Sequence, residues 1–149
     1  MRKILVIHGP NLDLLGKREP AIYGRVTLKK INNALAKIAK KRGVGLTIRQ
    51  SNHEGEIVEL IGKAKDKYAA LLINPAAYTH TSVAIRDALA ASGILTVEVH
   101  LSNIYSREEF RQKSLISPVA KGSVLGFGLK SYTLGLEALL DLIPSAKIP

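Results

Sequence analysis

The chain has 149 residues, a formal net charge of +10 and no cysteine. The length predicts a single domain, residues 1–149, with a core large enough to fold without a disulfide or a structural metal. The absence of cysteine excludes disulfides and thiol chemistry and fits a cytoplasmic protein. No apolar run approaches a membrane-spanning length of about 18 residues, and the first residues lack the pattern of a signal peptide, so we expect no membrane partner.

The positive charge is compatible with nucleic acid binding, with an anionic substrate or simply with solubility. The densest basic cluster lies on one predicted helix, opposite its apolar stripe, and comprises Lys29, Lys30, Lys37, Lys40, Lys41 and Arg42. No aromatic residue is interleaved with these side chains, as a groove for single-stranded nucleic acid would require. We therefore interpret the cluster as a solvated helix face and expect no nucleic acid partner.

The first predicted strand, residues 3–7, is continuously apolar, which indicates burial on both faces. A long segment without regular structure follows it, between Gly9 and Gly24. Connections between a strand and a helix usually need about 2–6 residues, and longer ordered loops are often functional. The segment is therefore either a surface insertion or part of a functional site.

The first predicted helix starts at Thr27, a residue type that caps helix N-termini, and ends at Gly43, which suits a left-handed C-terminal cap. Its apolar positions are spaced as one stripe and are Leu28, Ile31, Leu35 and Ile38. The helix is therefore expected to pack one face on a sheet.

The rest of the chain continues to alternate between strand and helix patterns. The expected elements are a strand over 44–50 at or near a sheet edge, a loop over 51–55, a helix with apolar positions from 57 to 64, a strand over 69–73, and a helix capped within 79–82 and closed by Gly93. They continue with a strand over 94–99, a helix over 107–113 opened by a capping box of Ser106 and Glu109, a strand over 124–127, and a helix that carries Tyr132 and ends at Pro144.

Strands that alternate with helices predict an α/β fold, with a parallel sheet and helices on both faces. Right-handed crossovers leave few topologies for five such units. The pattern is most similar to a flavodoxin-like three-layer fold with a five-stranded parallel sheet.

Ligands of open parallel sheets bind beyond the carboxyl ends of the strands. Three of these ends carry many polar groups, namely Asn11, Arg18 and Tyr23 after the first strand, Asn74 and His80 after the third, and Glu98, His100, Leu101, Ser102, Arg107 and Arg111 at and after the fourth. We expect these residues to converge on one site.

Several common sites are excluded by their missing motifs. The chain has no G-x-x-x-x-G-K-[ST] phosphate loop and no G-x-S-x-G nucleophile elbow, and Gly126-Phe127-Gly128 lacks the third glycine of a dinucleotide fingerprint. The histidines lack metal-ligand spacing, and no aspartate cluster follows the strands. We therefore expect neither a metal nor a cofactor.

The remaining residue types favour an anionic substrate and proton transfer, since arginine binds carboxylates and His or Tyr can move protons. For Tyr23 to act as a base near pH 7, its pKa of about 10 must fall by about 3 units, or about 4 kcal/mol. An arginine at about 4 Å supplies about that much at an effective dielectric near 20. The alternative is that Tyr23 is a turn residue packed beside Gly24.

Simpler structural roles exist for four other candidates. His80 could cap the helix that follows it, and Asp87 could be an ordinary surface carboxylate. Glu98 lies inside a strand, where a buried carboxylate needs partners, of which His100 is only one candidate. Asn11 could serve only to form the turn after Pro10.

Three long motifs in the right order resemble the type II 3-dehydroquinate dehydratases of the shikimate and quinate pathways. They are H-G-P-N-L-D-L-L-G-K-R-E-P-x-I-Y-G from His8, A-Y-T-H-T-S-V-A-I-R-D-A-L from Ala77 and V-E-V-H-L-S-N-I-Y-S-R-E-E-F-R from Val97. The resemblance covers essentially the whole chain. One departure is Ala76, where the family usually has glycine, and it removes no functional group.

This resemblance implies that water is eliminated from 3-dehydroquinate, through an enolate, to give 3-dehydroshikimate. It makes Tyr23 the base, held as tyrosinate by Arg18, and Asn11 a stabiliser of the enolate. His100 becomes the general acid, oriented by Glu98. The segment that carries Arg18 and Tyr23 is then also expected to act as a lid.

The resemblance also implies the substrate contacts and the assembly. Asn74 and the backbone of Leu101 and Ser102 match a carboxylate pocket, His80 and Arg111 match positions that bind substrate hydroxyls, Arg107 adds positive potential near Tyr23, and Asp87 matches a residue that reaches a neighbouring subunit's site. The family uses no metal or Schiff base and forms homododecamers, as tetramers of trimers. A flavin- or nucleotide-binding module and a nucleic acid binder remain the competing hypotheses.

Overall fold

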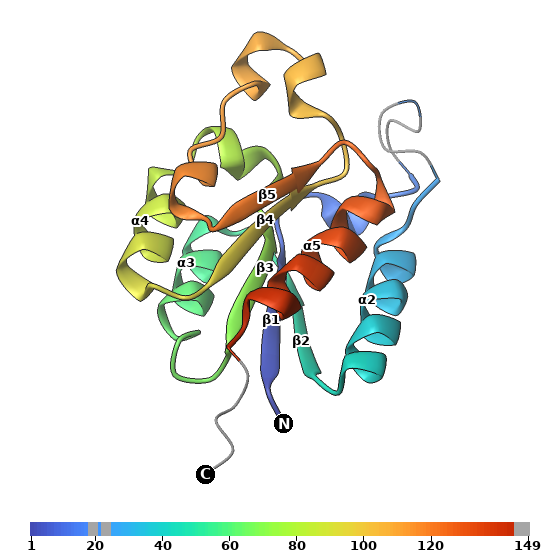
Figure 1. The fold of residues 1–149 in the computed structure, drawn as a ribbon. Coiled ribbons are helices and arrows are strands. Elements are labelled where there is room, and N and C mark those ends of the chain that lie inside the picture. The colour runs from blue at the N-terminus through green and yellow to red at the C-terminus, as the bar shows by residue number, and fades with distance from the viewer. Residues whose placement is uncertain (18–20, 22–24, 145–149) are drawn as a thin grey trace.

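Five parallel strands form one sheet in the order β2-β1-β3-β4-β5, within a computed structural model that describes residues 1–17, 21 and 25–144 (Figure 1). The strands are β1 Lys3–His8, β2 Gly45–Gln50, β3 Ala70–Asn74, β4 Thr96–His100 and β5 Gly122–Leu125. This is the flavodoxin-like order that the sequence predicts, with β2 at one edge.

The first strand lies inside the sheet, between β2 and β3, and its apolar run is explained by burial on both faces. Ile4 and Val6 join the core on one side, whereas Leu5 and Ile7 join the core on the other. Side chains of a strand alternate between its two faces, so a strand covered on both sides must be apolar throughout.

Helices cover both faces of the sheet, as the alternating pattern predicts. In the described part of the chain they are α2 Leu28–Arg42, α3 Glu54–Gly62, α4 Val83–Ser92 and α5 Leu129–Leu142. Figure 1 shows α2 and α5 on one face and α3 and α4 on the other. Within the described ranges, no helix combines the length and apolar character needed to cross a membrane.

The caps predicted for α2 and α4 are confirmed. The hydroxyl of Thr27 accepts the Lys30 N–H at 3.2 Å, and that of Ser82 accepts the Ile85 N–H at 2.9 Å. The C-terminal caps Gly43 and Gly93 adopt positive φ angles of +69° and +63°. Local chemistry therefore sets the ends of these helices.

The prediction of a helix over 107–113 is wrong. Short 3-10 turns occur instead at Ile104–Ser106 and Glu109–Arg111. Arg107 between them has extended backbone angles, and the Ser106 hydroxyl donates to the Asn103 carbonyl rather than capping a helix. The crossover from β4 to β5 therefore contains no α-helix.

Several other boundaries differ from the sequence prediction by a few residues, and two of these differences concern α3 and β5. The segment predicted as a loop over 51–55 already starts α3 at Glu54. The last strand covers Gly122–Leu125 rather than 124–127, because Gly126 with a φ of +93° turns the chain out of the sheet. Both differences are short shifts that leave the topology unchanged.

Candidate active site

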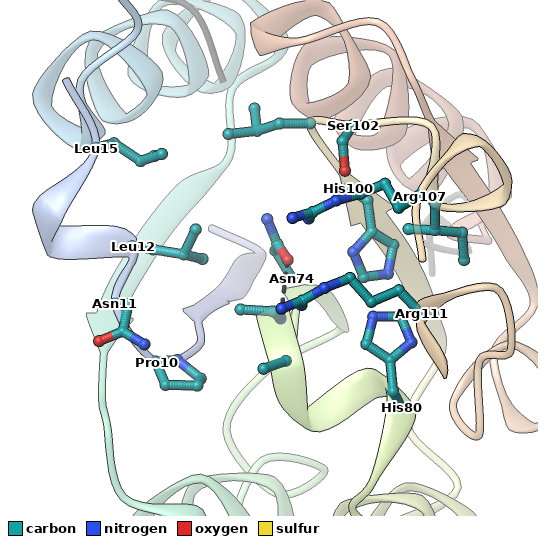
Figure 2. A pocket seen from close by; sticks show the side chains of 14 residues that line it. Pro10, Asn11, Leu12, Leu15, Asn74, His80, His100, Ser102, Arg107 and Arg111 are labelled. Carbon is teal, nitrogen blue, oxygen red and sulfur yellow. Dashed lines mark hydrogen bonds between the residues drawn. The ribbon is translucent and has the colours of Figure 1, made fainter. Parts of the chain in front are cut away.

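A cavity of about 140 Å³ lies at the carboxyl ends of β1, β3 and β4, where the sequence places the polar groups (Figure 2). Its lining comprises Pro10, Asn11, Leu12, Leu15, Asn74, Ala76, Ala77, His80, His100, Leu101, Ser102, Ile104, Arg107 and Arg111. The volume suits a small molecule, since one water needs roughly 10–15 Å³ on this measure. The predicted convergence of Asn11, Asn74, His80 and His100 is therefore found.

Asn11 reaches the cavity because the chain leaves β1 close to the end of β3. The Gly9 N–H donates to the Asn74 carbonyl at 2.8 Å, and a Cβ on Gly9 would lie 2.4 Å from the Pro75 carbonyl oxygen. Asn11 has a positive φ of +66°, and its N–H donates to Asn52 Oδ1 at 3.0 Å. Asn11 thus forms the turn and lines the cavity as well.

Glu98 and His100 form a buried pair behind this cavity, with the Nε2–H of His100 donating to Glu98 Oε1 over 2.6 Å. Both residues are on β4, two positions apart, so their side chains share one face of the sheet. Glu98 is fully buried, while the ring of His100 reaches the cavity (Figure 2). The pairing expected of these two residues is present.

Four hydroxyl groups complete the surroundings of the Glu98 carboxylate. They belong to Thr79, Ser114, Ser117 and Ser123. Burial by itself would raise the pKa of Glu98, but the hydrogen bonds and charge of His100 and the bonds from Ser117 and Ser114 outweigh it, and the net pKa is lowered. The carboxylate is therefore held ionised directly behind the histidine that lines the cavity.

Asn74 ends β3 with its side chain at the cavity and only 3% exposed. Its Oδ1 accepts the backbone N–H of Ala76 at 3.0 Å (Figure 2). Ala76 has a φ of +53°, a conformation that costs non-glycine residues energy. The tight turn at Ala76 therefore directs the Asn74 amide.

His80 lines the cavity and does not cap α4, because Ser82 occupies that position. Its Nδ1–H donates to the Lys113 carbonyl at 2.8 Å. Burial lowers the pKa of His80, and the nearby His100 and Arg111 lower it further. The imidazole is therefore held neutral, and its other nitrogen is left as a hydrogen-bond acceptor.

Two arginines from the β4–β5 crossover also line the cavity. Arg111 Nε donates to Glu108 Oε2 at 2.8 Å, and Arg107 Nε lies 3.9 Å from Glu108 Oε1. The pKa of Glu108 is lowered, chiefly by the Arg111 hydrogen bond. Glu108 thus fixes the Arg111 guanidinium by a hydrogen bond, and it lies at ion-pair distance from Arg107.

The other predicted residues divide into three groups. Leu101 and Ser102 line the cavity, as expected. Asp87 lies exposed on α4 and is absent from the lining. Arg18 and Tyr23, with the expected lid, lie outside the described residues.

The sequence gives no sign that the hydroxyl groups around Glu98 are its partners, although Ser114 and Ser117 belong to the stretches that resemble the family. A carboxylate inside a strand does indicate that donors must exist, but Ser114, Ser117 and Ser123 are 16 to 25 positions away from Glu98. Among the described residues, no three His, Cys, Asp or Glu side chains are grouped to hold a metal. The donor set suits anion binding and proton transfer.

Comparisons with known proteins agree with this arrangement. Residues 2–140 match the family described as dehydroquinase class II. The chain is 59% identical over 140 residues to the 3-dehydroquinate dehydratase of Trichodesmium erythraeum, a match that covers 94% of this chain and 93% of that protein. It is 56% identical over 140 residues to the enzyme of the same name from Pelotomaculum thermopropionicum, with 94% and 97% covered. The type II dehydroquinase structure from Butyrivibrio crossotus superposes with a TM-score of 0.90 at 45% identity, over 93% of this chain and 97% of that one.

Proposed function

Since the chain belongs to the class II dehydroquinase family, we infer that it is a hydro-lyase that removes water from 3-dehydroquinate to give 3-dehydroshikimate. The observation in the molecule that carries this function is the buried pair of Glu98 and His100 at a cavity lined by donors for an anionic substrate. This reaction belongs to the shikimate pathway, and the same chemistry serves quinate breakdown.

The elimination proceeds in two proton transfers. Tyr23, kept as tyrosinate by Arg18, takes the proton α to the ketone and leaves an enolate, which Asn11 stabilises. His100 then gives its proton to the departing hydroxyl, the C–O bond breaks, and water leaves. The ionised Glu98 supports this step because it accepts the Nε2–H of His100 and so orients the imidazole.

The substrate is held by the remaining cavity residues. Asn74 and the backbone of Leu101 and Ser102 bind the carboxylate, and His80 and Arg111 bind hydroxyl groups. Arg107 adds positive potential that favours the tyrosinate form of Tyr23. The lining of the cavity by these residues supports the proposal.

We also infer the oligomeric state and the absence of a cofactor from the resemblance to this family. The chain works as one domain, residues 1–149, in a homododecamer built as a tetramer of trimers, without a metal or cofactor. The exposed position of Asp87 on α4 is compatible with its contributing to the site of a neighbouring subunit. The cytoplasmic location expected from the composition stays a prediction.

One absorbance assay tests the function. Chelator-treated, folded protein is mixed with 3-dehydroquinate, and formation of the conjugated enone is followed without added metal or cofactor. Growth of the absorbance is expected, and its absence would contradict the proposed reaction.

A variant tests the proposed base. Tyr23→Phe removes only the hydroxyl, so turnover should be abolished while the circular dichroism spectrum and the melting temperature stay near those of the unmodified protein. An active variant would remove Tyr23 from its role.

A further inference from the structure

The loop that follows β2 contacts the loop that follows β1. Gln50 ends β2 and lies opposite His8 in the register of the sheet, and the Ser51 N–H donates to the His8 carbonyl at 3.0 Å. One residue further along, Asn52 Oδ1 accepts the Asn11 N–H at 3.0 Å. The contact between these two parts of the chain therefore continues beyond the ends of both strands.

The side chain of Asn52 is held in place by Gln50. The Asn52 atom that faces the Asn11 N–H is its amide oxygen, because a backbone N–H can only donate. The Gln50 amide donates to the same oxygen at 3.1 Å and to the Gly9 carbonyl at 3.2 Å, which uses both hydrogens of its NH₂ group. Gln50 thus fixes both Asn52 and the start of the loop after β1.

The backbone of Asn52 is held as well, by a second segment of the cavity wall. Its carbonyl accepts the Tyr78 hydroxyl at 2.8 Å. Tyr78 belongs to the 3-10 segment Ala76–His80, which lines the cavity with three of its residues. Asn52 is absent from the cavity lining, yet it joins the segment of Asn11 to the segment of His80.

These contacts hold Asn11 in an unfavourable backbone conformation. Its φ of +66° and ψ of 1° lie in the left-handed region, which L-residues seldom adopt. Its carbonyl accepts the Leu14 N–H at 3.0 Å, and its N–H donates to Asn52. With both backbone groups bonded, the direction of the Cα–Cβ bond of Asn11 is set, and with it the place from which the side chain lines the cavity.

We propose that Asn52 is a positioning residue, which holds the turn at Asn11 so that the Asn11 side chain meets the enolate. The inference rests on the proposed function for the role of Asn11. Because the enolate forms only during the reaction, a misplaced Asn11 lowers kcat and leaves substrate binding nearly unchanged. The β2 edge of the sheet thereby contributes to catalysis through a residue outside the cavity.

Amide hydrogen exchange, followed by NMR on the unmodified protein and on Asn52→Ala, tests the contact itself. The Asn11 N–H should exchange about tenfold faster in the variant, because it loses its acceptor. Equal exchange rates in the two proteins would overturn the proposal. This measurement needs no substrate, so absent turnover by the unmodified protein would refute the proposed function without changing the exchange result.

Kinetics of Asn52→Ala then test the effect on the reaction. The variant should show kcat for 3-dehydroquinate lowered about tenfold with KM within about twofold, as for misplacement of a group that acts in the transition state. The matched control is Asn33→Ala, an exposed asparagine on α2, which should leave both constants unchanged. A lower melting temperature of Asn52→Ala with normal kcat would show a merely structural role and overturn the proposal.

A double-mutant cycle separates positioning from an independent contribution. Asn11→Gly removes the side chain but adopts the left-handed conformation freely, so kcat should fall while the turn is kept. Adding Asn52→Ala to it should change kcat by less than about twofold, because the two residues act through one contact. If Asn52→Ala lowers kcat by the same factor with and without the Asn11 side chain, the proposal is wrong.

Discussion

The Nε2–H of His100 donates to Glu98 Oε1 over 2.6 Å, and the carboxylate behind it is fully buried and bonded by four hydroxyl groups. A buried carboxylate with this many donors stays ionised, and its nearest titratable neighbour is the histidine that faces the cavity. The pair therefore places a fixed negative charge directly behind the histidine that faces the cavity.

Replacing Glu98 with glutamine tests this relationship. Glu98→Gln keeps the size and an acceptor oxygen for His100 but removes the negative charge, so kcat should fall about 100-fold or more, within the range lost when general acid catalysis is impaired. Steady-state kinetics with 3-dehydroquinate measure the effect, and the exposed Glu59→Gln serves as a control that should retain full activity. A Glu98→Gln enzyme with normal kcat would show that the charge is not needed.

The stability of the protein should fall in mild acid because of His8. Burial lowers its pKa from 6.5 to about 4 in the folded protein, so between these values the unfolded chain binds the proton and the folded one does not. The free energy of unfolding should therefore decrease as pH falls from about 6.5 to 4, by on the order of 3 kcal/mol from this group. Glu98, whose pKa is lowered from 4.5, acts in the same direction at still lower pH.

Urea unfolding at a series of pH values measures this effect. The variant His8→Asn should show a markedly smaller slope between pH 6.5 and 4 than the unmodified protein, with the remaining slope coming from His80, whose pKa is also lowered. The exposed His53→Asn should keep that slope. An equal slope in His8→Asn and the unmodified protein would contradict the assignment.

The turn at Ala76 predicts a stabilising substitution. Its φ of +53° costs an L-residue about 1–2 kcal/mol, whereas glycine adopts it freely but loses about 0.5–1 kcal/mol through its greater freedom in the unfolded chain. Ala76→Gly should therefore raise the free energy of unfolding by about 0.5–1 kcal/mol. Because the methyl group carries no function, kcat should stay within about twofold.

The neighbouring alanine is the matched control for this turn. Ala77 lies in the same 3-10 segment, Ala76–His80, without a positive φ. Ala77→Gly should thus lower the free energy of unfolding by about 0.5–1 kcal/mol. Denaturant titrations should show that the two substitutions change the free energy of unfolding in opposite directions. A change in the same direction for both variants would rule out strain at Ala76.

The failed prediction over 107–113 shows where local patterns lose their value. Ser106 and Glu109 have the spacing of a capping box, but Asn103 caps the turn at Tyr105 and Ser106 bonds back to the Asn103 carbonyl. The arginines of this segment lie at the cavity beside Glu108 instead of on a helix. Contacts across the β4–β5 crossover outweigh a weak helical preference.

The buried contact between His8 and Tyr132 shows a different limit. The apolar spacing of the last helix predicts that Tyr132 is buried, and it is. The sequence pattern does not show which group forms a hydrogen bond with the Tyr132 hydroxyl, because its partner His8 is 124 positions away. Only the packing of α5 on the sheet brings the two side chains together.

By itself, the sequence determined the order of the strands and of helices α2 to α5, the caps at Thr27, Gly43 and Gly93, the stretch 79–82 in which α4 is capped, and the polar residues at the strand ends. These depend on side-chain periodicity and on hydrogen bonds between near neighbours, which act within a few residues. The tertiary structure decided which hydroxyl groups surround Glu98 and which side chains contact the buried His8. Those outcomes depend on donors and acceptors that meet only after the sheet and its helices have packed, since each buried polar group must then find its partner among residues distant in the chain.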